Sequence, residues 1–375
     1  MLVGIGVFRS ERLGGNEPMK GMIAVQFLLA GIGAVALFSA SWYFARTVFG
    51  DPFRIWRRQI FWMILGTVGA LVIARVPGKL IRKSVPYLVW SALILNLSTY
   101  IPGVGYSSGG ARRWIEISGM TFQPSELTRV ALVLYLARML EKNESRLENF
   151  RDGLLPPLLV VSALILTVYF QNDFSTAMYL LFISFGMFFA AGVSRAAVSI
   201  AGVTAVMSAA AMLLLKPYRL VRLKSWFHPA ADPSGAGYQL LKARSALENG
   251  GLWGLGLGRG EVKMGGLPAA HSDFVVAVVG EETGFIGVFF VLLLFTVFAV
   301  KGWQAAGKAS DTFSRWGLFG LISAVYWQAL INFSVVSGLL PATGIPLPLF
   351  SAGGSAAFIT LIIFGLIYNL SEAGK

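Results

Sequence analysis

Residues 284–300 read GFIGVFFVLLLFTVFAV, a run of 17 residues without a single charge. One helix needs about 20 mostly apolar residues to cross the hydrocarbon core of a membrane, and the apolar stretch around this run covers about 279–300. The same criterion selects nine further stretches, at about 22–45, 59–76, 85–101, 124–140, 154–170, 174–193, 197–215, 316–337 and 355–370. The sequence therefore predicts an all-α, polytopic membrane protein with about ten transmembrane helices.

The overall composition supports this class of protein. Of the 375 residues, 56% are hydrophobic and 13% are charged, whereas soluble domains average about 25% charged residues. The chain has no cysteine and two histidines, which excludes disulfide scaffolds, thiolate chemistry and metal sites built from histidine and cysteine. No Walker A lysine is present, which argues against an ATP-driven pump. The formal net charge is +13, so the positions of the basic residues carry information.

Lysine and arginine residues near the ends of the expected spans indicate the orientation. An even number of spans places both termini on one side, and that side carries 16 Lys and Arg residues against 6 in the short loops opposite. Short loops rich in Lys and Arg stay in the cytoplasm. We therefore expect residues 1–21 and 371–375 to be cytoplasmic and residues 22–370 to form the transmembrane domain. The outward cluster from Arg54 to Arg58 contradicts the rule, and topology does not explain it.

One long loop, residues 216–273, is expected outside the membrane. Basic and apolar residues alternate irregularly in 216–226 and again in 237–247, which predicts two amphipathic helices, the first in the membrane interface. Glycine dominates from 250 to 266. Glycine permits close approach of the backbone, so this segment, with Arg259 and Lys263, could receive an anion. A flexible linker explains the glycines equally well.

The loop ends in LPAAHSDF, residues 267–274, directly before the apolar run. Ser272 or Asp273 in this position is usually the N-cap of the following helix. Alternatively, Asp273 lies beside His271 at the membrane surface, beneath a basic loop. A carboxyl group there could have a raised pKa and act as a general base. The spacing leaves both interpretations open.

Two further segments carry unusual residues at membrane depth. Glu126 and Arg129 begin the expected helix 124–140 and are three residues apart, so they share a face and can form either a structural ion pair or part of a functional site. Residues 338–355 are rich in proline and glycine. Irregular backbone at membrane depth is tolerated only where it is buried in protein or lines a cavity. We expect one of these situations for 338–355.

Several short motifs identify a related family. They are QPSE at 123–126, GYQ at 237–239, LPAAHSDF at 267–274 with GEE at 280–282, and TGIPLP at 343–348 followed by SAGGS at 351–355. With these motifs the chain resembles, over about 20–370, the SEDS family of bacterial shape, elongation, division and sporulation proteins, which includes FtsW and RodA.

The resemblance implies a ten-helix peptidoglycan glycosyltransferase of the bacterial cytoplasmic (inner) membrane. Such an enzyme polymerises lipid II on the outer side and works with a class B penicillin-binding protein, within the divisome or the elongasome. Asp273 matches the family's essential loop aspartate, the favoured general base, and Glu126 matches the glutamate of its QPSE motif. Arg129 stands where the family usually has lysine. Arg58 matches the arginine of a family Arg-Gln pair, which offers a use for the outward cluster.

Two motifs depart from the family's usual pattern. The usual LPEAHTDF has Ala269 and Ser272 here, and the usual SYGGS has Ala352 in place of tyrosine. The aspartate is retained, whereas a role for positions 269 and 352 becomes doubtful. Lys263 and the GEE run look more like FtsW than RodA, which favours a role in division over one in elongation.

The implied reaction joins two lipid-linked saccharides with inversion. The GlcNAc 4-hydroxyl of lipid II attacks MurNAc C1 of the growing glycan, and polyprenyl pyrophosphate leaves. This chemistry requires a base, for which Asp273 is the candidate, and positive charge for the pyrophosphate. A divalent cation, Mg²⁺ or Mn²⁺, could share that work, although no metal ligands can be assigned, and no organic cofactor or nucleic acid is implied. The candidate substrate-binding residues are Arg58, Glu126, Arg129, Lys242, Arg244, Arg259, Lys263, His271, Ser351, Gly353, Gly354 and Ser355.

Two other functions fit the same residues in part. A flippase that moves lipid II outward would also use basic residues for the pyrophosphate, but it needs no base at the end of the loop. A scaffold that only positions a penicillin-binding protein would tolerate substitution of Asp273. Formation of glycan from lipid II in detergent separates an enzyme from both alternatives.

Overall fold

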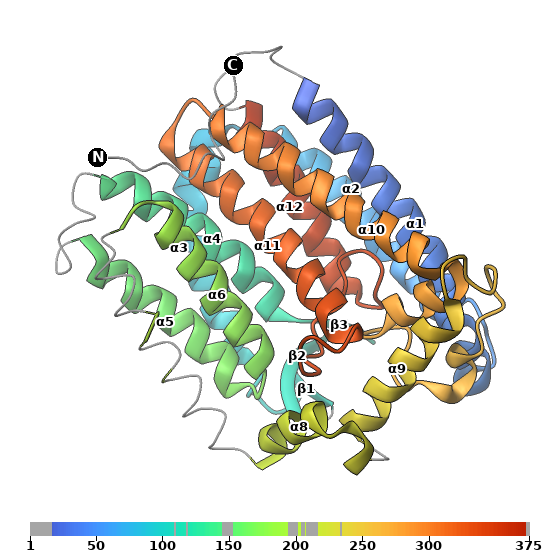
Figure 1. Ribbon diagram of the computed structural model, residues 1–375. Helices are drawn as coiled ribbons and strands as arrows, with labels where there is room; N and C mark the ends of the chain where they lie inside the picture. The colour runs from blue at the N-terminus through green and yellow to red at the C-terminus, as the bar shows by residue number, and fades with distance from the viewer. Residues whose placement is uncertain are drawn as a thin grey trace.

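The computed structural model describes residues 17–108, 110–117, 119–144, 153–193, 202–203, 207, 217–232 and 235–372. Long helices packed side by side make up most of it (Figure 1). In chain order the main helices are α1 (Glu17–Phe49), α2 (Arg54–Ala74), α3 (Gly78–Ser98), α4 (Pro124–Lys142), α5 (Leu155–Phe170), α6 (Phe174–Ala190), α8 (Pro217–Phe227), α9 (Ala236–Gly250), α10 (Val275–Gly307), α11 (Thr312–Val336) and α12 (Gly354–Glu372).

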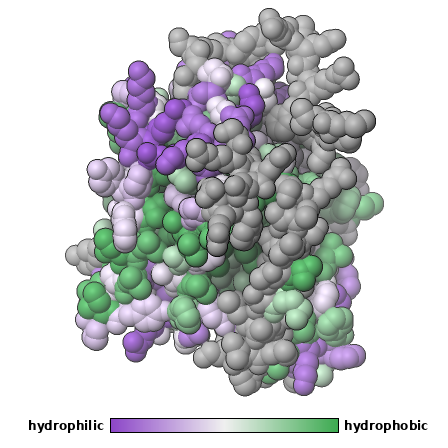
Figure 2. All heavy atoms as spheres, turned by 90° about the vertical axis from the view of Figure 1, so that its left-hand side faces the viewer, coloured by the Kyte–Doolittle hydropathy of each residue, from purple (hydrophilic) through white to green (hydrophobic). Residues whose placement is uncertain are grey.

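Helices occupy nine of the ten predicted spans, α1–α6 and α10–α12. The tenth, at 197–215, lies almost entirely outside the described residues, as do residues 1–16 and 373–375 of the predicted cytoplasmic ends. By length and composition α1, α2, α10, α11 and α12 can each cross a membrane, and α5 and α6 are shorter apolar helices. Figure 2 shows a hydrophobic band on one face, between hydrophilic residues above and a sparser group below. The prediction of a polytopic helical membrane protein is confirmed.

Small residues allow the helices nearest the candidate site to pack closely. Helices α2 and α12 run side by side, and Gly66, Gly69 and Gly365 lie at their contact. A Cβ atom at Gly365 would lie 2.5 Å from the backbone oxygen of Ala70, so a larger residue would force the helices apart. Small residues at helix contacts are the usual way for membrane helices to approach one another. This packing fixes the start of α2 relative to the start of α12.

A three-stranded antiparallel sheet, which the sequence analysis did not predict, joins α3 to α4. Its strands are β1 (Gly105–Ser108), β2 (Ala111–Ile117) and β3 (Met120–Phe122), in the order β1-β2-β3. Ile115 pairs with Phe122, and Tyr106 pairs with Trp114. The chain is therefore mainly α-helical, as predicted, with one small sheet added to the helices. The sheet lies with α8 and α9 at one end of the helical bundle (Figure 1).

Helix α10 is kinked, and the glycine-rich segment packs on the kink. Gly284 has φ +68°, which interrupts the helical hydrogen bonds. The carbonyl oxygens of Glu281 and Glu282 instead accept hydrogen bonds from the backbone N–H groups of Leu255 and Gly256, both at 3.0 Å. These N–H groups are therefore engaged by the protein itself. The segment is neither a free linker nor an anion cradle at this point.

Candidate functional site

A cavity of about 500 Å³ lies where α2, α4, α11 and the start of α12 meet the end of the long loop. The irregular segment before α12 contributes Gly344, Ile345 and Pro346 to its wall, which confirms that this backbone lines a cavity. Eight of the thirteen predicted site residues line the same cavity: Arg58, Glu126, Arg129, His271, Asp273, Gly353, Gly354 and Ser355. Residues from both ends of the chain and from the long loop therefore form one site.

Asp273 is held at the cavity wall by its backbone. Helix α10 begins at Val275 with Phe274 as its N-cap residue, and no side chain caps it, so the interpretation of Ser272 or Asp273 as an N-cap is wrong. The Asp273 carbonyl oxygen accepts a hydrogen bond from Asn332 Nδ2 at 3.0 Å. Gly344 approaches the carboxyl group so closely that a Cβ there would lie 3.4 Å from Asp273 Oδ2. The residue as a whole is half-buried, and it lines the cavity.

The surroundings of Asp273 change its acidity. Burial raises the pKa of its carboxyl group above the ordinary value, and the charges of Arg113 and Arg222 lower it in part. Burial lowers the pKa of His271, whose ring lies 4.6 Å from the ring of Phe44. A lowered pKa favours the neutral imidazole. Burial thus moves the pKa of Asp273 toward neutral pH and the pKa of His271 away from it, and a general base works best when its pKa lies near the operating pH.

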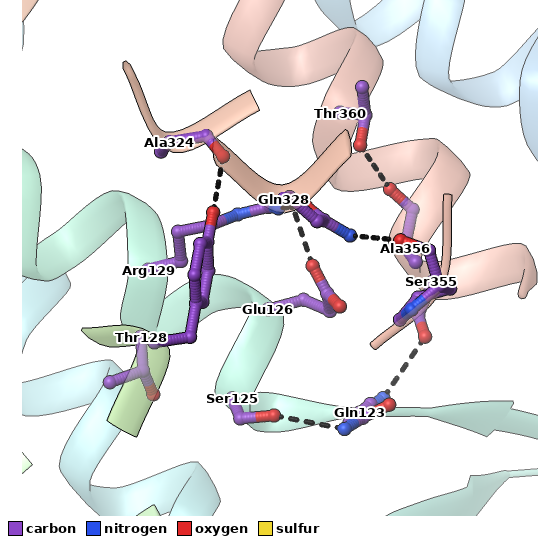
Figure 3. A network of polar contacts seen from close by, with 12 residues as sticks. Gln123, Ser125, Glu126, Thr128, Arg129, Ala324, Gln328, Ser355, Ala356 and Thr360 are labelled. Atoms are coloured by element: carbon purple, nitrogen blue, oxygen red, sulfur yellow. Dashed lines mark hydrogen bonds and ion pairs between the residues drawn. The ribbon is translucent and has the colours of Figure 1, made fainter. Parts of the chain in front are cut away.

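Glu126 and Arg129, which both line the cavity, form a buried ion pair (Figure 3). The carboxylate Oε2 lies 2.9 Å from Arg129 Nη2, and Arg129 also donates to Gln328 Oε1 of α11. Both residues line the cavity, although Glu126 is 8% exposed and Arg129 only 2%. Tyr179 of α6, which also lines the cavity, donates its hydroxyl hydrogen to the carbonyl oxygen of Ala324. The predicted pair is present, and it faces the cavity.

Gln59 of α2 clamps the turn that leads into α12. Its Nε2 donates to the carbonyl oxygen of Ser351 at 3.2 Å, and its Oε1 accepts from the N–H of Gly353 at 3.2 Å. Ser351 lies in the turn rather than at the cavity, and its Oγ accepts from the N–H of Leu347 at 2.9 Å. Ser355 Oγ accepts from the N–H of Gln123 at 3.3 Å. These bonds tie both ends of the SAGGS run to neighbouring elements.

Four predicted basic residues lie away from this cavity. Lys242 lies over the ring of Tyr238, with its Nζ 5.6 Å from the ring centre, Arg244 packs against Gly338, and Arg259 folds back on Gly256. Lys263 is fully buried and pairs with Glu282, while its Nζ donates to Ser39 Oγ of α1 at 2.8 Å. Charge alone makes these four residues candidates for contact with the substrate. For Lys263 the structure corrects this, because its ammonium group is already satisfied inside the protein.

Sequence reasoning missed several cavity residues. Arg113 and Trp114 reach the wall from β2, Tyr179 reaches it from α6 and Gln328 from α11. Arg113 pairs with Asp173, 3.3 Å away, and its guanidinium carbon lies 4.4 Å from the ring centre of Trp114. The aromatic and β-branched residues Trp114, Ile115 and Ile117, in a segment bounded by Gly110 and Gly119, could have indicated this strand. No pattern in the sequence singles out Tyr179 or Gln328.

Besides the buried pair of Glu126 and Arg129, the cavity presents the carboxyl group of Asp273 and the guanidinium groups of other arginines. Arg58, whose Nη2 donates to Thr121 Oγ1 at 3.0 Å, lines the cavity with Arg113 and Arg129. Within the residues that the structure describes, no group of three or more His, Asp or Glu side chains could hold a metal ion. Chemically, the site can accept a proton at Asp273 and bind an anion at the arginines.

Comparisons with known proteins agree on one family. The sequence pattern that defines the family described as "Cell cycle protein" (FtsW, RodA and SpoVE) matches residues 19–375. The chain is 36% identical to the "Probable peptidoglycan glycosyltransferase FtsW" of Geobacter sp. (strain M18), over 96% of this chain and 98% of that one. It is 33% identical to the "Stage V sporulation protein E" of Bacillus subtilis (strain 168), over 96% and 98%.

Solved structures agree with this likeness. A chain from the work described as "Structural coordination of polymerization and crosslinking by a peptidoglycan synthase complex" superposes with a TM-score of 0.78 at 26% identity, over 94% of this chain and 96% of that one. The rod shape determining protein RodA of Thermus thermophilus superposes with a TM-score of 0.68 at 25% identity, over 94% and 95%.

Proposed function

Because the chain belongs to the FtsW, RodA and SpoVE family of cell cycle proteins, we propose that it is a peptidoglycan glycosyltransferase with Asp273 as its general base. The observation that carries the assignment of the base is the position of Asp273, a carboxyl group of raised pKa in the wall of a cavity that also presents Arg58, Arg113 and Arg129. Its substrate is lipid II, and its product is a glycan strand.

The reaction follows from these groups. Asp273 accepts the proton of the acceptor's GlcNAc 4-hydroxyl while that oxygen attacks MurNAc C1 of the donor. The bond between C1 and the pyrophosphate oxygen breaks, the configuration at C1 inverts, and polyprenyl pyrophosphate leaves. Arginine side chains stabilise the charge that develops on the leaving group, because charge-assisted hydrogen bonds are stronger than neutral ones.

The Mg²⁺ or Mn²⁺ ion that the resemblance allows would bind chiefly through the substrate's pyrophosphate. Mg²⁺ is commonly held by one or two carboxylates together with substrate phosphates. The described residues offer no larger cluster of ligands. Arginine side chains in the cavity walls are therefore the protein's own contribution to neutralising the substrates' pyrophosphates.

The setting of the enzyme is part of the proposal. The 16 basic residues on one side of the spans, against 6 in the short loops opposite, support a location in the bacterial cytoplasmic membrane with both termini in the cytoplasm and the cavity outside. The partner is a class B penicillin-binding protein, and the likeness to a chain of a peptidoglycan synthase complex supports this. The relatives named FtsW support a role in division.

Polymerisation of lipid II by the purified protein in detergent tests the function. We expect glycan strands from the wild-type chain, alone or with its cognate transpeptidase, on a gel that resolves glycan length. Detergent micelles have no second leaflet, so a product cannot come from flipping. Absence of product under both conditions, together with transport of lipid II across vesicles, would support a flippase and contradict the proposal.

The pH dependence of polymerisation is expected to report Asp273. A base must be ionised, so the rate falls as the pH drops through its pKa. Because burial raises that pKa, the acid limb of kcat/KM should lie above about pH 4, the ordinary value for aspartate. Arg113→Gln removes a charge that lowers the pKa and should move the limb to still higher pH. An acid limb that stays near pH 4, or does not move in Arg113→Gln, would contradict Asp273 as the titrating base.

A further inference from the structure

A second cavity, of about 540 Å³, also has Asp273 in its wall. Its wall comes from β2, the start of α6, helix α8 and residues 341–344. Helix α8 and the sheet lie at the same end of the bundle in Figure 1. This cavity therefore sits outside the helical core, whereas the first cavity extends between α2, α4 and α11.

The two cavities share part of their walls. Asp273, Arg113, Trp114 and Gly344 line both. A transfer between two lipid-linked saccharides needs two binding sites that meet at the reacting atoms, with the base at the junction. The shared wall provides such a junction, and Asp273 is the general base that the proposed function places there.

The two substrates place their pyrophosphates at different distances from the reaction. In the donor, the pyrophosphate is bonded to C1, the atom under attack. In the acceptor, two sugar rings separate the pyrophosphate from the attacking 4-hydroxyl. The cations that serve the leaving group must therefore lie close to the base, and those that hold the acceptor's pyrophosphate must lie farther away.

Two arginines divide in the same way, because Arg222 lines only the second cavity and Arg58 only the first, whereas Arg113 lines both. Arg113 and Arg222 are the basic residues whose charge acts on Asp273, and both line the second cavity. Arg222 is exposed, and its guanidinium makes a long hydrogen bond of 3.5 Å to the carbonyl oxygen of Ala342. Arg58 lines only the first cavity, at its α2 side, and Arg129 is neutralised there by Glu126.

The second cavity is also built to hold its arginines in place. Arg219 is 4% exposed, and its guanidinium carbon lies 4.9 Å and 4.6 Å from the ring centres of Tyr169 and Phe174. Arg113 is fixed by Asp173, which is buried and caps α6 through the N–H of Thr176. Arginines oriented by aromatic rings and by a carboxylate lose little freedom when they bind an anion.

We propose that the second cavity binds the donor, with Arg222 and Arg113 contacting its pyrophosphate, and that the first cavity binds the acceptor lipid II, with Arg58 contacting its pyrophosphate. The assignment rests on the proposed glycosyltransferase function. It gives each cavity one substrate and leaves Asp273 between the donor C1 and the acceptor hydroxyl.

Two lipid II analogues, one that can serve only as donor and one only as acceptor, test the assignment of each cavity separately. A lipid II analogue with hydrogen in place of the GlcNAc 4-hydroxyl can donate but cannot accept. An analogue with a methylene group in place of the oxygen bonded to MurNAc C1 can accept but cannot donate. The wild-type chain should couple the two probes once, which gives a KM for each probe when the other is saturating.

The variants have opposite expected effects on the two KM values. Arg222→Gln should raise KM for the donor probe roughly 10- to 100-fold, the value of one charge-assisted hydrogen bond, and leave KM for the acceptor probe unchanged. Arg58→Gln should do the reverse. Lys224→Gln is the matched control, because Lys224 is exposed on the same helix as Arg222 but does not line the cavity. It should change neither value.

The outcomes distinguish a failure of the cavity assignment from a failure of the glycosyltransferase function. If the wild-type chain couples the probes but Arg222→Gln raises KM for the acceptor probe, or for neither, the assignment of the cavities is overturned while the function stands. A rise in both values would also overturn it, because a general disturbance of the fold produces that pattern. If the wild-type chain does not couple the probes at all, the glycosyltransferase function fails, and the assignment fails with it.

Discussion

Replacing Asp273 with asparagine is expected to lower the rate of lipid II polymerisation by about 10²- to 10⁴-fold, the range typical for loss of a general base. Asparagine keeps the size of the side chain but cannot accept the proton of the attacking hydroxyl. The position itself should remain ordered, because Asn332 binds the backbone oxygen of residue 273 rather than its side chain. The measurement is the initial rate of glycan formation by the purified variant.

A matched variant controls for a general loss of acidic charge. Glu116 of β2 is an exposed carboxylate at the same end of the molecule and lines neither cavity. Glu116→Gln should therefore polymerise at the wild-type rate. Thermal unfolding in detergent should give the same midpoint for both variants and the wild type. Near-normal glycan synthesis by Asp273→Asn would rule out Asp273 as the base and would favour a scaffold function.

Breaking the buried pair between Glu126 and Arg129 is expected to have the second largest effect. Removing one partner leaves the other buried and uncompensated, which typically costs about 3–5 kcal/mol of folding free energy. Arg129→Met and Glu126→Gln should each be strongly destabilised, whereas the double variant should regain most of that stability because no unpaired charge remains. The measurement is the free energy of unfolding, or the melting midpoint, in detergent.

The double variant also separates a structural pair from a functional one. Both residues line the cavity, so we expect polymerisation by the double variant to stay at least about tenfold below wild type, the value of one lost charge-assisted bond, although stability recovers. Recovery of activity together with stability would make the pair purely structural. Glu141→Gln on the same helix is the control, since its partly exposed partner Arg82 makes a surface pair worth at most about 1 kcal/mol.

The helices were predictable because a membrane imposes a simple requirement on sequence. A span needs a long apolar run, and such runs are visible without any knowledge of packing. The sheet was missed because its strands are short and lie between two apolar runs, so β2 was interpreted as part of a loop. That omission also hid Arg113, which reaches the cavity only because β2 pairs with β1 and β3.

The charge of a side chain did not predict whether it lies at the site, because the sequence does not show which charged side chains are buried. Lys263 and Arg58 are equally basic in the sequence, yet Lys263 is enclosed by Glu282 and Ser39, whereas Arg58 faces the cavity. Ser39 lies 224 positions from Lys263 in the sequence, and no local sequence pattern predicts such a contact. The resemblance to a family placed Asp273, whereas spacing alone could not separate a base from a helix cap.

The contacts of Glu281 and Glu282 determine where the segment before α10 can change in length. Glu281 Oε2 accepts from the N–H of Val262 at 3.0 Å, and Glu282 pairs with Lys263. Residues 262–282 are thus a ring closed by buried polar bonds, with Asp273 halfway round it. Residues inserted ahead of α9, before 236, fall outside the ring and outside the contacts of Leu255 and Gly256 with Glu281 and Glu282, and they leave its geometry unchanged. A single insertion between 264 and 272 changes the circumference, and it displaces the carboxyl group from the junction of the two cavities.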